Sequence, residues 1–151
     1  MSTANLEIKT AIQILRPVHQ VFEAIADPDE IAKYFIAEST GRLEEGKEVK
    51  WKFPEFDEKF PIRVVKIEED KLISFYWKIQ EKEFLVEITL DAIREDATVV
   101  TITEKEMENN PAGIEWLKGN TEGWANFLAC LQAYLEYGIN LRMGAFDFKK
   151  V

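Results

Sequence analysis

The sequence contains few of the residues on which most enzyme chemistry depends, with 1 cysteine and 1 histidine among 151 residues. A catalytic thiol needs a basic partner, and His19 lies far from Cys130 along the chain. We therefore interpret Cys130 as a small buried hydrophobic residue and His19 as a solvent-facing one. Glycine-rich nucleotide loops, metal-ligand spacings and catalytic-triad patterns are also missing. The sequence predicts no cofactor, no metal and no catalytic residue, and it favours a protein that is not an enzyme.

Long apolar runs are absent as well. No segment approaches the ~18–20 consecutive apolar residues that a membrane span requires, and residues 1–10 lack the basic and apolar regions of a secretory signal. Acidic residues outnumber basic ones by 28 to 19, and the net charge of −9 repels phosphate backbones. A single cysteine suits a reducing compartment. We therefore expect a cytoplasmic protein without membrane insertion and without a nucleic-acid partner.

What is present is the composition of an ordinary globular protein, with 46% hydrophobic and 31% charged residues. A chain of this length buries about two-thirds of the surface of its unfolded form, so it can have a core without disulfides or metals. No internal repeat or linker-like change of composition divides it. We therefore predict one domain over residues 1–151, and the sequence leaves its oligomeric state open.

The N-terminal part is predicted to combine one strand with two short helices. Apolar and polar side chains alternate over residues 6–14, which is the period of a strand with one buried face. Residues 17–26 show helical spacing behind Pro17, whose missing N–H suits a first turn. Asp27 and Pro28 are a favourable N-cap and first residue for a second helix.

Residues 39–107 are predicted to be a series of strands. Runs rich in β-branched and aromatic residues follow one another with only short acidic turns between them. These turns lie at Glu45-Gly46, Glu69-Asp70 and Glu95-Asp96. Short turns join antiparallel neighbours, because a parallel pair needs a long crossover. The sequence therefore predicts a meander of about six strands, or seven with the N-terminal one.

The longest helical pattern lies over residues 120–142, with Asn120 or Thr121 as its N-cap. Large apolar side chains recur there at steps of three and four, so one face of the helix is apolar. About 22 residues make a rod of ~33 Å, and only the sheet is large enough to bury it. We predict an α+β fold in which a curved antiparallel sheet wraps around the C-terminal helix and leaves a cavity between them.

The start of this helix contains an unusual pair, Gly123 and Trp124. We expect Gly123 to let the sheet approach the helix backbone and Trp124 to cover one end of the cavity. The preceding residues 108–119 contain a proline and two glycines, so we predict a loop there, with at most one helical turn and with Trp116 and Leu117 exposed.

Two segments resemble the START-like or helix-grip superfamily, also called SRPBCC. They are "RPVHQVFEAIADPDEIAKYF" (residues 16–35) and "NTEGWANFLACLQAYLE" (residues 120–136). Within the superfamily the chain is similar to the branch named after the activator of the heat-shock protein 90 ATPase. The matching positions are Pro17, Val21, Phe22, Ala24, Asp27, Pro28, Tyr34, Phe35, Glu122, Gly123, Trp124, Leu128 and Leu131.

This resemblance implies a helix-grip fold with a hydrophobic ligand cavity or, as in the eukaryotic activators, a chaperone-binding surface. It covers only one domain of those activators, which carry an additional N-terminal module. Our first hypothesis is therefore a protein that binds a small hydrophobic or amphipathic molecule, such as a lipid or a polyketide-like aromatic compound. A chaperone-interaction module is the second, supported by the exposed-looking residues 111–117. An enzyme of the cyclase or hydrolase type is the third.

The residues expected to bind the ligand are aromatic positions on alternating strands together with the apolar helix face. They are Trp51, Phe53, Phe75, Trp77, Glu104, Trp124, Phe127, Leu131 and Tyr134. The alternative for each aromatic residue is that it belongs to a solid core, and a slip of one position would exchange Tyr76 for Trp77.

Glu104 is the one charged residue among these positions. It follows Val100 and Ile102 on the same strand face, so it could reach the cavity and bind a ligand hydroxyl or act as a general acid. The interpretation that we favour is a strand end at which Glu104 reaches solvent.

Overall fold

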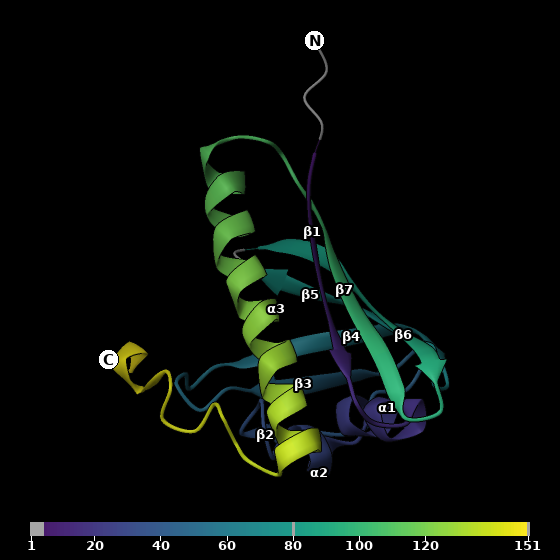
Figure 1. Cartoon of the computed structure of the whole chain (residues 1–151). Coiled ribbons are helices and arrows are strands. Elements are labelled where there is room, and N and C mark those ends of the chain that lie inside the picture. The colour runs from purple at the N-terminus through teal and green to yellow at the C-terminus, as the bar shows by residue number, and fades with distance from the viewer. Residues whose placement is uncertain (1–4, 80, 151) are drawn as a thin grey trace.

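The computed structural model describes residues 5–79 and 81–150, which form one seven-stranded sheet and a long helix (Figure 1). The strands are β1 (Leu6–Ile14), β2 (Glu38–Ser39), β3 (Glu48–Lys52), β4 (Lys59–Glu68), β5 (Leu72–Ile79), β6 (Lys82–Arg94) and β7 (Ala97–Met107). The helices are α1 (Val18–Ala26), α2 (Pro28–Ile31), α3 (Pro111–Tyr137) and a short 3-10 turn, η1 (Asp147–Lys149). The predicted α+β helix-grip fold is therefore confirmed.

The sheet is antiparallel throughout, in the order β1-β7-β6-β5-β4-β3-β2. Neighbours from β2 to β7 follow one another along the chain, and β1 joins the edge beside β7. The predicted turns at residues 69–70 and 95–96 connect β4 to β5 and β6 to β7. Asp70 has a φ of 62°, a conformation that aspartate tolerates better than most residues. Local turn chemistry thus accounts for the meander.

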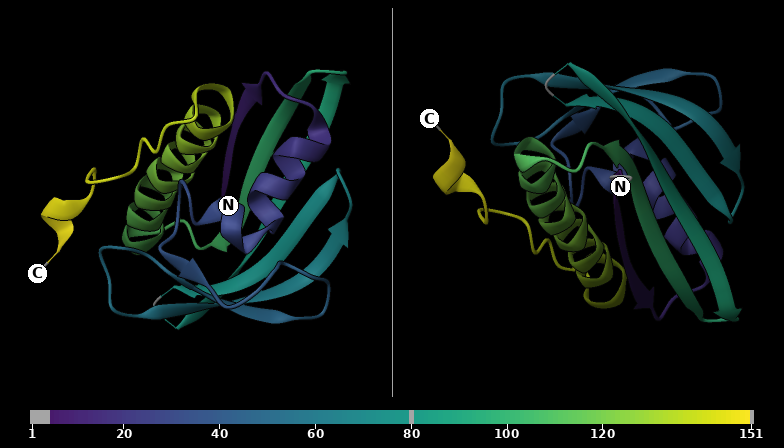
Figure 2. Two further views of the ribbon diagram at one scale, coloured as in Figure 1. Left: turned by 90° about the horizontal axis from the view of Figure 1, so that it is seen from below. Right: turned by 90° about the horizontal axis from the view of Figure 1, so that it is seen from above.

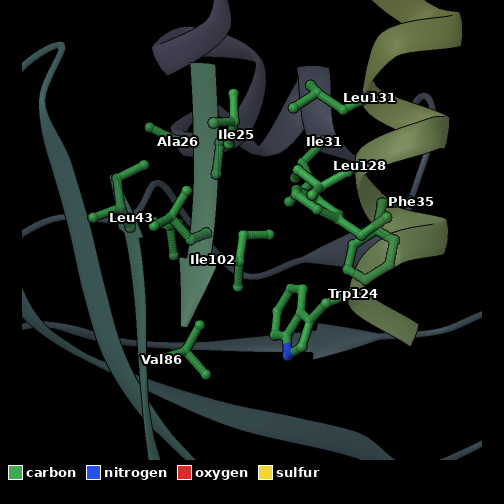
Figure 3. Close-up of a cluster of buried hydrophobic side chains, with 14 of the residues drawn as sticks. Ile25, Ala26, Ile31, Phe35, Leu43, Val86, Ile102, Trp124, Leu128 and Leu131 are labelled. Carbon is green, nitrogen blue, oxygen red and sulfur yellow. The ribbon is translucent and has the colours of Figure 1, made fainter. Parts of the chain in front are cut away.

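The sheet curves around α3, while α1 and α2 lie at one end of the concave face (Figure 2). Side chains from the sheet and the three helices meet in the core, where Ile102 lies among Ile25, Ile31 and Leu131 (Figure 3). The second helix begins as predicted, since the Asp27 side chain accepts a hydrogen bond of 2.8 Å from the backbone N–H of Asp29. The short helices therefore close the core beside α3.

Helix α3 begins about ten residues earlier than the sequence pattern suggested. Its N-cap is Asn110, whose side-chain oxygen accepts a hydrogen bond of 2.8 Å from the backbone N–H of Gly113. Pro111 occupies the first helical position, where proline is favoured. The prediction of a loop over residues 108–119 was wrong, because the proline and glycine that we interpreted as helix breakers belong to the first turn.

This earlier start changes the environment of the aromatic residues in the segment. Trp116 is only 7% exposed and Leu117 is half-buried against the core, so the expected exposure of this pair was wrong. At the other end, Gly138 takes a left-handed conformation with φ 67° and terminates the helix. Residues 138–150, called the C-terminal segment below, leave the helix and run away from the sheet (Figure 2).

The close backbone approach occurs at Gly113 rather than at Gly123. A Cβ atom on Gly113 would lie 1.9 Å from the carbonyl oxygen of Glu108. For Gly123, no atom of the described residues would lie within 4 Å of such a Cβ. The expected role of Gly123 in admitting the sheet was therefore wrong.

Candidate functional site

An aromatic groove of about 260 Å³ opens between one end of the sheet, the first half of α3 and the C-terminal segment. Seven aromatic side chains line it: Phe35, Phe53, Phe56, Phe60, Trp77, Trp124 and Phe146. They come from the α2–β2 connection, the β3–β4 connection, β4, β5, α3 and the C-terminal segment. Elements distant in the sequence thus converge on one apolar surface, which we call the groove.

Three of the residues predicted to bind a ligand line this groove, namely Phe53, Trp77 and Trp124. The ring centroids of Trp77 and Trp124 lie 5.3 Å apart, so these two side chains bring β5 and α3 into contact beside the groove. Tyr76 lies in a different environment, with its ring 4.7 Å from the Arg63 guanidinium. The register therefore brings Trp77, rather than Tyr76, to the groove.

Four other predicted positions belong to the solid core. Trp51, Phe75, Phe127 and Leu131 are all essentially inaccessible to solvent. The rings of Trp51 and Phe75 lie 5.6 Å apart in an edge-to-face arrangement, which is the usual geometry of packed aromatic pairs. The interface between sheet and helix is thus filled in this region, and it opens only at the groove.

Tyr134, a further predicted position, packs on the opposite side of the core. Its ring stacks on Tyr34 at a centroid distance of 5.1 Å, and its hydroxyl donates to the carboxylate of Glu30. Burial, followed by the neighbouring Glu30, raises the pKa of the Tyr134 hydroxyl. This residue connects α3 to α2 and lies outside the groove lining.

Glu104 is the main correction at the site, because it is buried with 0% of its surface exposed. One carboxylate oxygen accepts hydrogen bonds from Trp116 Nε1 at 3.2 Å and Asn120 Nδ2 at 3.0 Å, and the other accepts from Trp124 Nε1 at 2.5 Å. The favoured prediction of a solvent-facing strand end was wrong. The first half of α3 covers this end of β7, and the part of it before residue 120, which includes Trp116, had been predicted as a loop.

Burial raises the pKa of the Glu104 carboxyl, and the hydrogen bonds from Trp124, Trp116 and Asn120 oppose that rise. The buried indole N–H of Trp77 makes no hydrogen bond within the described residues. Its proximity nevertheless lowers the pKa of the Glu104 carboxyl, as the three hydrogen bonds do. Trp77, Asn120 and Trp124 each line the groove as well. A wall of two indoles and one amide therefore separates the carboxylate from the groove.

A buried ion pair connects the groove to the C-terminal segment. Arg142 binds both carboxylate oxygens of Glu55, and the two side chains are only 13% and 6% exposed. The guanidinium also lies within 6 Å of three rings, at 5.6 Å from Phe35, 5.4 Å from Phe53 and 4.9 Å from Phe146. A second hollow, of about 380 Å³, shares Glu55 and Arg142 in its lining.

Several residues of the groove were missed by the sequence interpretation. Phe56, Phe60, Phe146 and Lys149 line it. Phe35 was named in the family pattern but not among the expected ligand-binding residues. For Phe60 a signal was present, because it alternates with the buried Ile62 and Val64 on β4. Phe56, Phe146 and Lys149 lie outside the strands and the helix face used for the prediction.

The structure also brings together His19, Glu69 and Asp70, whose possible ligand atoms lie within 4.8 Å of one another. His19 Nδ1 is 2.8 Å from a carboxylate oxygen of Asp70, and this hydrogen bond raises the pKa of the imidazole. The His19 side chain is solvent-exposed, as predicted. Cys130 is buried, and burial raises the pKa of its thiol, so it has the properties of an inert core cysteine.

The fold and sequence are similar to those of known proteins. A sequence model of the family described as "Activator of Hsp90 ATPase homolog 1-like protein" matches residues 16–136. The protein SSP2350 from Staphylococcus saprophyticus is 34% identical, with a TM-score of 0.80 over 91% of this chain and 96% of that chain. No curated protein matches the sequence.

Two further solved structures are similar. DynU16, from the dynemicin biosynthetic locus, is 25% identical with a TM-score of 0.77, over 87% of this chain and 48% of that one. The Aha1 dimer of Colwellia psychrerythraea is 19% identical with a TM-score of 0.75, over 88% and 98% of the two chains, and supports the fold alone. Among the helices in the described ranges, none is long and apolar enough to cross a membrane.

Proposed function

The chain belongs to the family of Activator of Hsp90 ATPase homolog 1-like proteins, and on this premise we propose that it binds a small hydrophobic or amphipathic molecule in the groove. The observation that carries the proposal is an open hollow of about 260 Å³ lined by seven aromatic side chains. Aromatic surface that is left in water gains free energy when a ligand covers it, at about 25 cal/mol per Å². Concave apolar surfaces with a few polar groups are typical of ligand sites.

The size of the groove limits the ligand. A closed apolar cavity of roughly 150 Å³ accommodates benzene, so a groove of about 260 Å³ has room for one or two rings or for part of a longer apolar chain. Lipids and polyketide-like compounds would therefore place only a portion of their structure inside.

Binding is a better description of this site than catalysis. Glu104 was the first residue considered as a general acid, but it has no exposed surface, and each of its oxygens already accepts a hydrogen bond. A general acid must reach the group that it protonates, and here two tryptophans and an asparagine intervene. Glu104 supports the wall of the groove instead.

The test is a fluorescence titration, because Trp77 and Trp124 line the groove and should report on a bound ring. We expect saturable quenching by 2-naphthalenemethanol, with native mass spectrometry confirming one bound molecule. Phe56→Asp should weaken binding at least about tenfold, since it places a charge in the apolar lining where Phe56 is 43% exposed. Ile93→Asp is the matched control, being similarly exposed but outside the lining. Absence of binding by the folded wild-type chain to naphthalene, fatty-acid and polyketide-like probes would refute the proposal.

A second candidate function is a protein-interaction module that acts on a chaperone ATPase. Its original support, an exposed residue 111–117 segment, is weakened because Trp116 is buried, although Ile114 is 40% exposed. Exposed apolar side chains occur instead in and beside the C-terminal segment, where Met143 and Phe148 are nearly 80% exposed. An unchanged ATPase rate of a heat-shock protein 90 chaperone in the presence of the chain would count against this function.

A further inference from the structure

The charges that line the groove differ from those of the whole chain. Three cations and two carboxylates line it, namely Lys78, Arg142, Lys149, Glu55 and Glu122, whereas the sequence has 19 basic and 28 acidic residues. A locally positive lining on an acidic protein concentrates anions at that place. We propose that the ligand of the groove is a small aromatic carboxylate, an inference that rests on the proposed function.

The pairing of these charges supports the assignment. Arg142 and Glu55 neutralise each other in their buried ion pair, so neither is available to a ligand. Within the described part of the chain, Lys78 and Lys149 form no ion pair with a carboxylate. The groove therefore presents two lysines against the single carboxylate of Glu122.

The position of Lys149 connects this charge to the aromatic lining. Its ammonium lies 5.1 Å from the ring centroid of Phe146, which itself lines the groove. A ring seated against Trp77 and Trp124 would contact the apolar lining, and a carboxylate attached to that ring could reach a lysine at the edge. Aromatic and carboxylate groups in one small molecule thus match the two kinds of surface that the groove offers.

The experiment compares three probes with the same ring: 2-naphthoate, 2-naphthalenemethanol and 2-naphthylmethylamine. Tryptophan fluorescence gives their Kd values at low and at high ionic strength. We expect the carboxylate to bind most tightly and the amine most weakly. Each exposed lysine should contribute up to about fivefold. The preference should decrease at high salt, because exposed charges are screened.

Single substitutions test whether Lys149 and Lys78 cause the preference for the carboxylate. Lys149→Gln and Lys78→Gln should each weaken 2-naphthoate binding by up to about fivefold and affect 2-naphthalenemethanol binding much less. Lys66→Gln is the matched control, since Lys66 is also exposed, but it lies outside the groove lining.

The outcomes separate the two proposals. Equal affinities for the carboxylate and the alcohol, or tightest binding of the amine, would overturn the present inference and leave the proposed function intact. A preference for the carboxylate that is undiminished in both lysine variants would also overturn it. Failure of all three probes, together with the fatty-acid and polyketide-like ones, would overturn the proposed function and this inference together.

Discussion

The two halves of helix α3 bury their side chains in different ways. In the second half, Phe127, Leu128 and Leu131 are almost completely buried in apolar contact with the sheet and the short helices (Figure 3). In the first half, Trp116 and Trp124 direct their indole N–H groups to the buried carboxylate of Glu104. From α3, residues between 119 and 126, around Trp124, line the groove.

The difference shows how one helix can stabilise the fold and also shape a site. Apolar contacts are non-directional, so the second half needs only side chains of suitable volume. Hydrogen bonds to a buried carboxylate are directional and fix the orientation of the indoles. The first half can therefore hold the ring of Trp124, against which Trp77 packs, at the edge of an open groove.

The largest expected effect comes from Gly113, in the first turn of α3. Gly113→Ala should lower the free energy of unfolding by about 3 kcal/mol, because its Cβ would overlap the carbonyl oxygen of Glu108, a backbone atom that cannot move aside cheaply. Urea unfolding followed by circular dichroism measures the change. A loss below about 0.5 kcal/mol would mean that the first turn of α3 is free to shift.

The next effect tests the carboxylate that distinguishes the first half. Glu104→Gln keeps the shape of the side chain but replaces one acceptor oxygen by an NH₂ group, which then faces N–H donors instead of accepting from them. The loss of stability should be roughly 1–3 kcal/mol, the penalty for a buried donor without an acceptor. Glu106→Gln is the matched control, because Glu106 is an exposed carboxylate on the same strand. Equal stabilities of the two variants would contradict the importance of the buried bonds.

Glu104→Gln also tests how the stability of the wild type depends on pH. The folded-state pKa of Glu104 is raised above its ordinary value, so the folded chain holds the proton more tightly than the unfolded chain does. The contribution of Glu104 to stability is thus greatest below its ordinary pKa and is lost as the pH rises through the folded pKa. From pH about 8 to about 5, the wild type should gain stability relative to Glu104→Gln, with a slope of at most about 1.4 kcal/mol per pH unit. Parallel curves would show that the pKa is not raised.

The fold was predictable from the sequence wherever the signal was local. Strand periodicity and acidic turns identified the meander, and the Asp27–Pro28 pair identified the start of α2. The start of α3 carried the same kind of local signal, because Asn110 is a favourable N-cap and Pro111 a favourable first residue. Gly113 obscured this signal, because glycine usually marks a break, whereas here its missing side chain leaves room for the carbonyl oxygen of Glu108.

That one error propagated into the site. Since residues 108–119 were expected to be a loop, nothing was expected to cover Glu104, and the carboxylate was assigned to solvent. The groove was only partly predictable for a related reason. Its outer edge depends on the contact between Arg142 and Glu55, which are 87 residues apart, and on the departure of the chain from the helix at Gly138. The first feature has no local sequence pattern, whereas Gly138 is a typical helix-ending residue that the prediction of a helix to residue 142 overlooked.

The smallest expected effect concerns Gly123, which faces the groove. Gly123→Ala should stabilise the chain by up to about 1 kcal/mol, because alanine favours a helix more than glycine does and no described atom obstructs the added methyl group. That methyl group would also enter the groove lining, so 2-naphthalenemethanol should bind slightly less tightly to the more stable variant. Gly119→Ala, also unobstructed and in the lining, should behave in the same way. A lower melting temperature for Gly123→Ala would support the close approach of the sheet that was first expected at this position. A higher melting temperature together with weaker binding would mean that glycine lowers the stability of α3 and keeps the groove open.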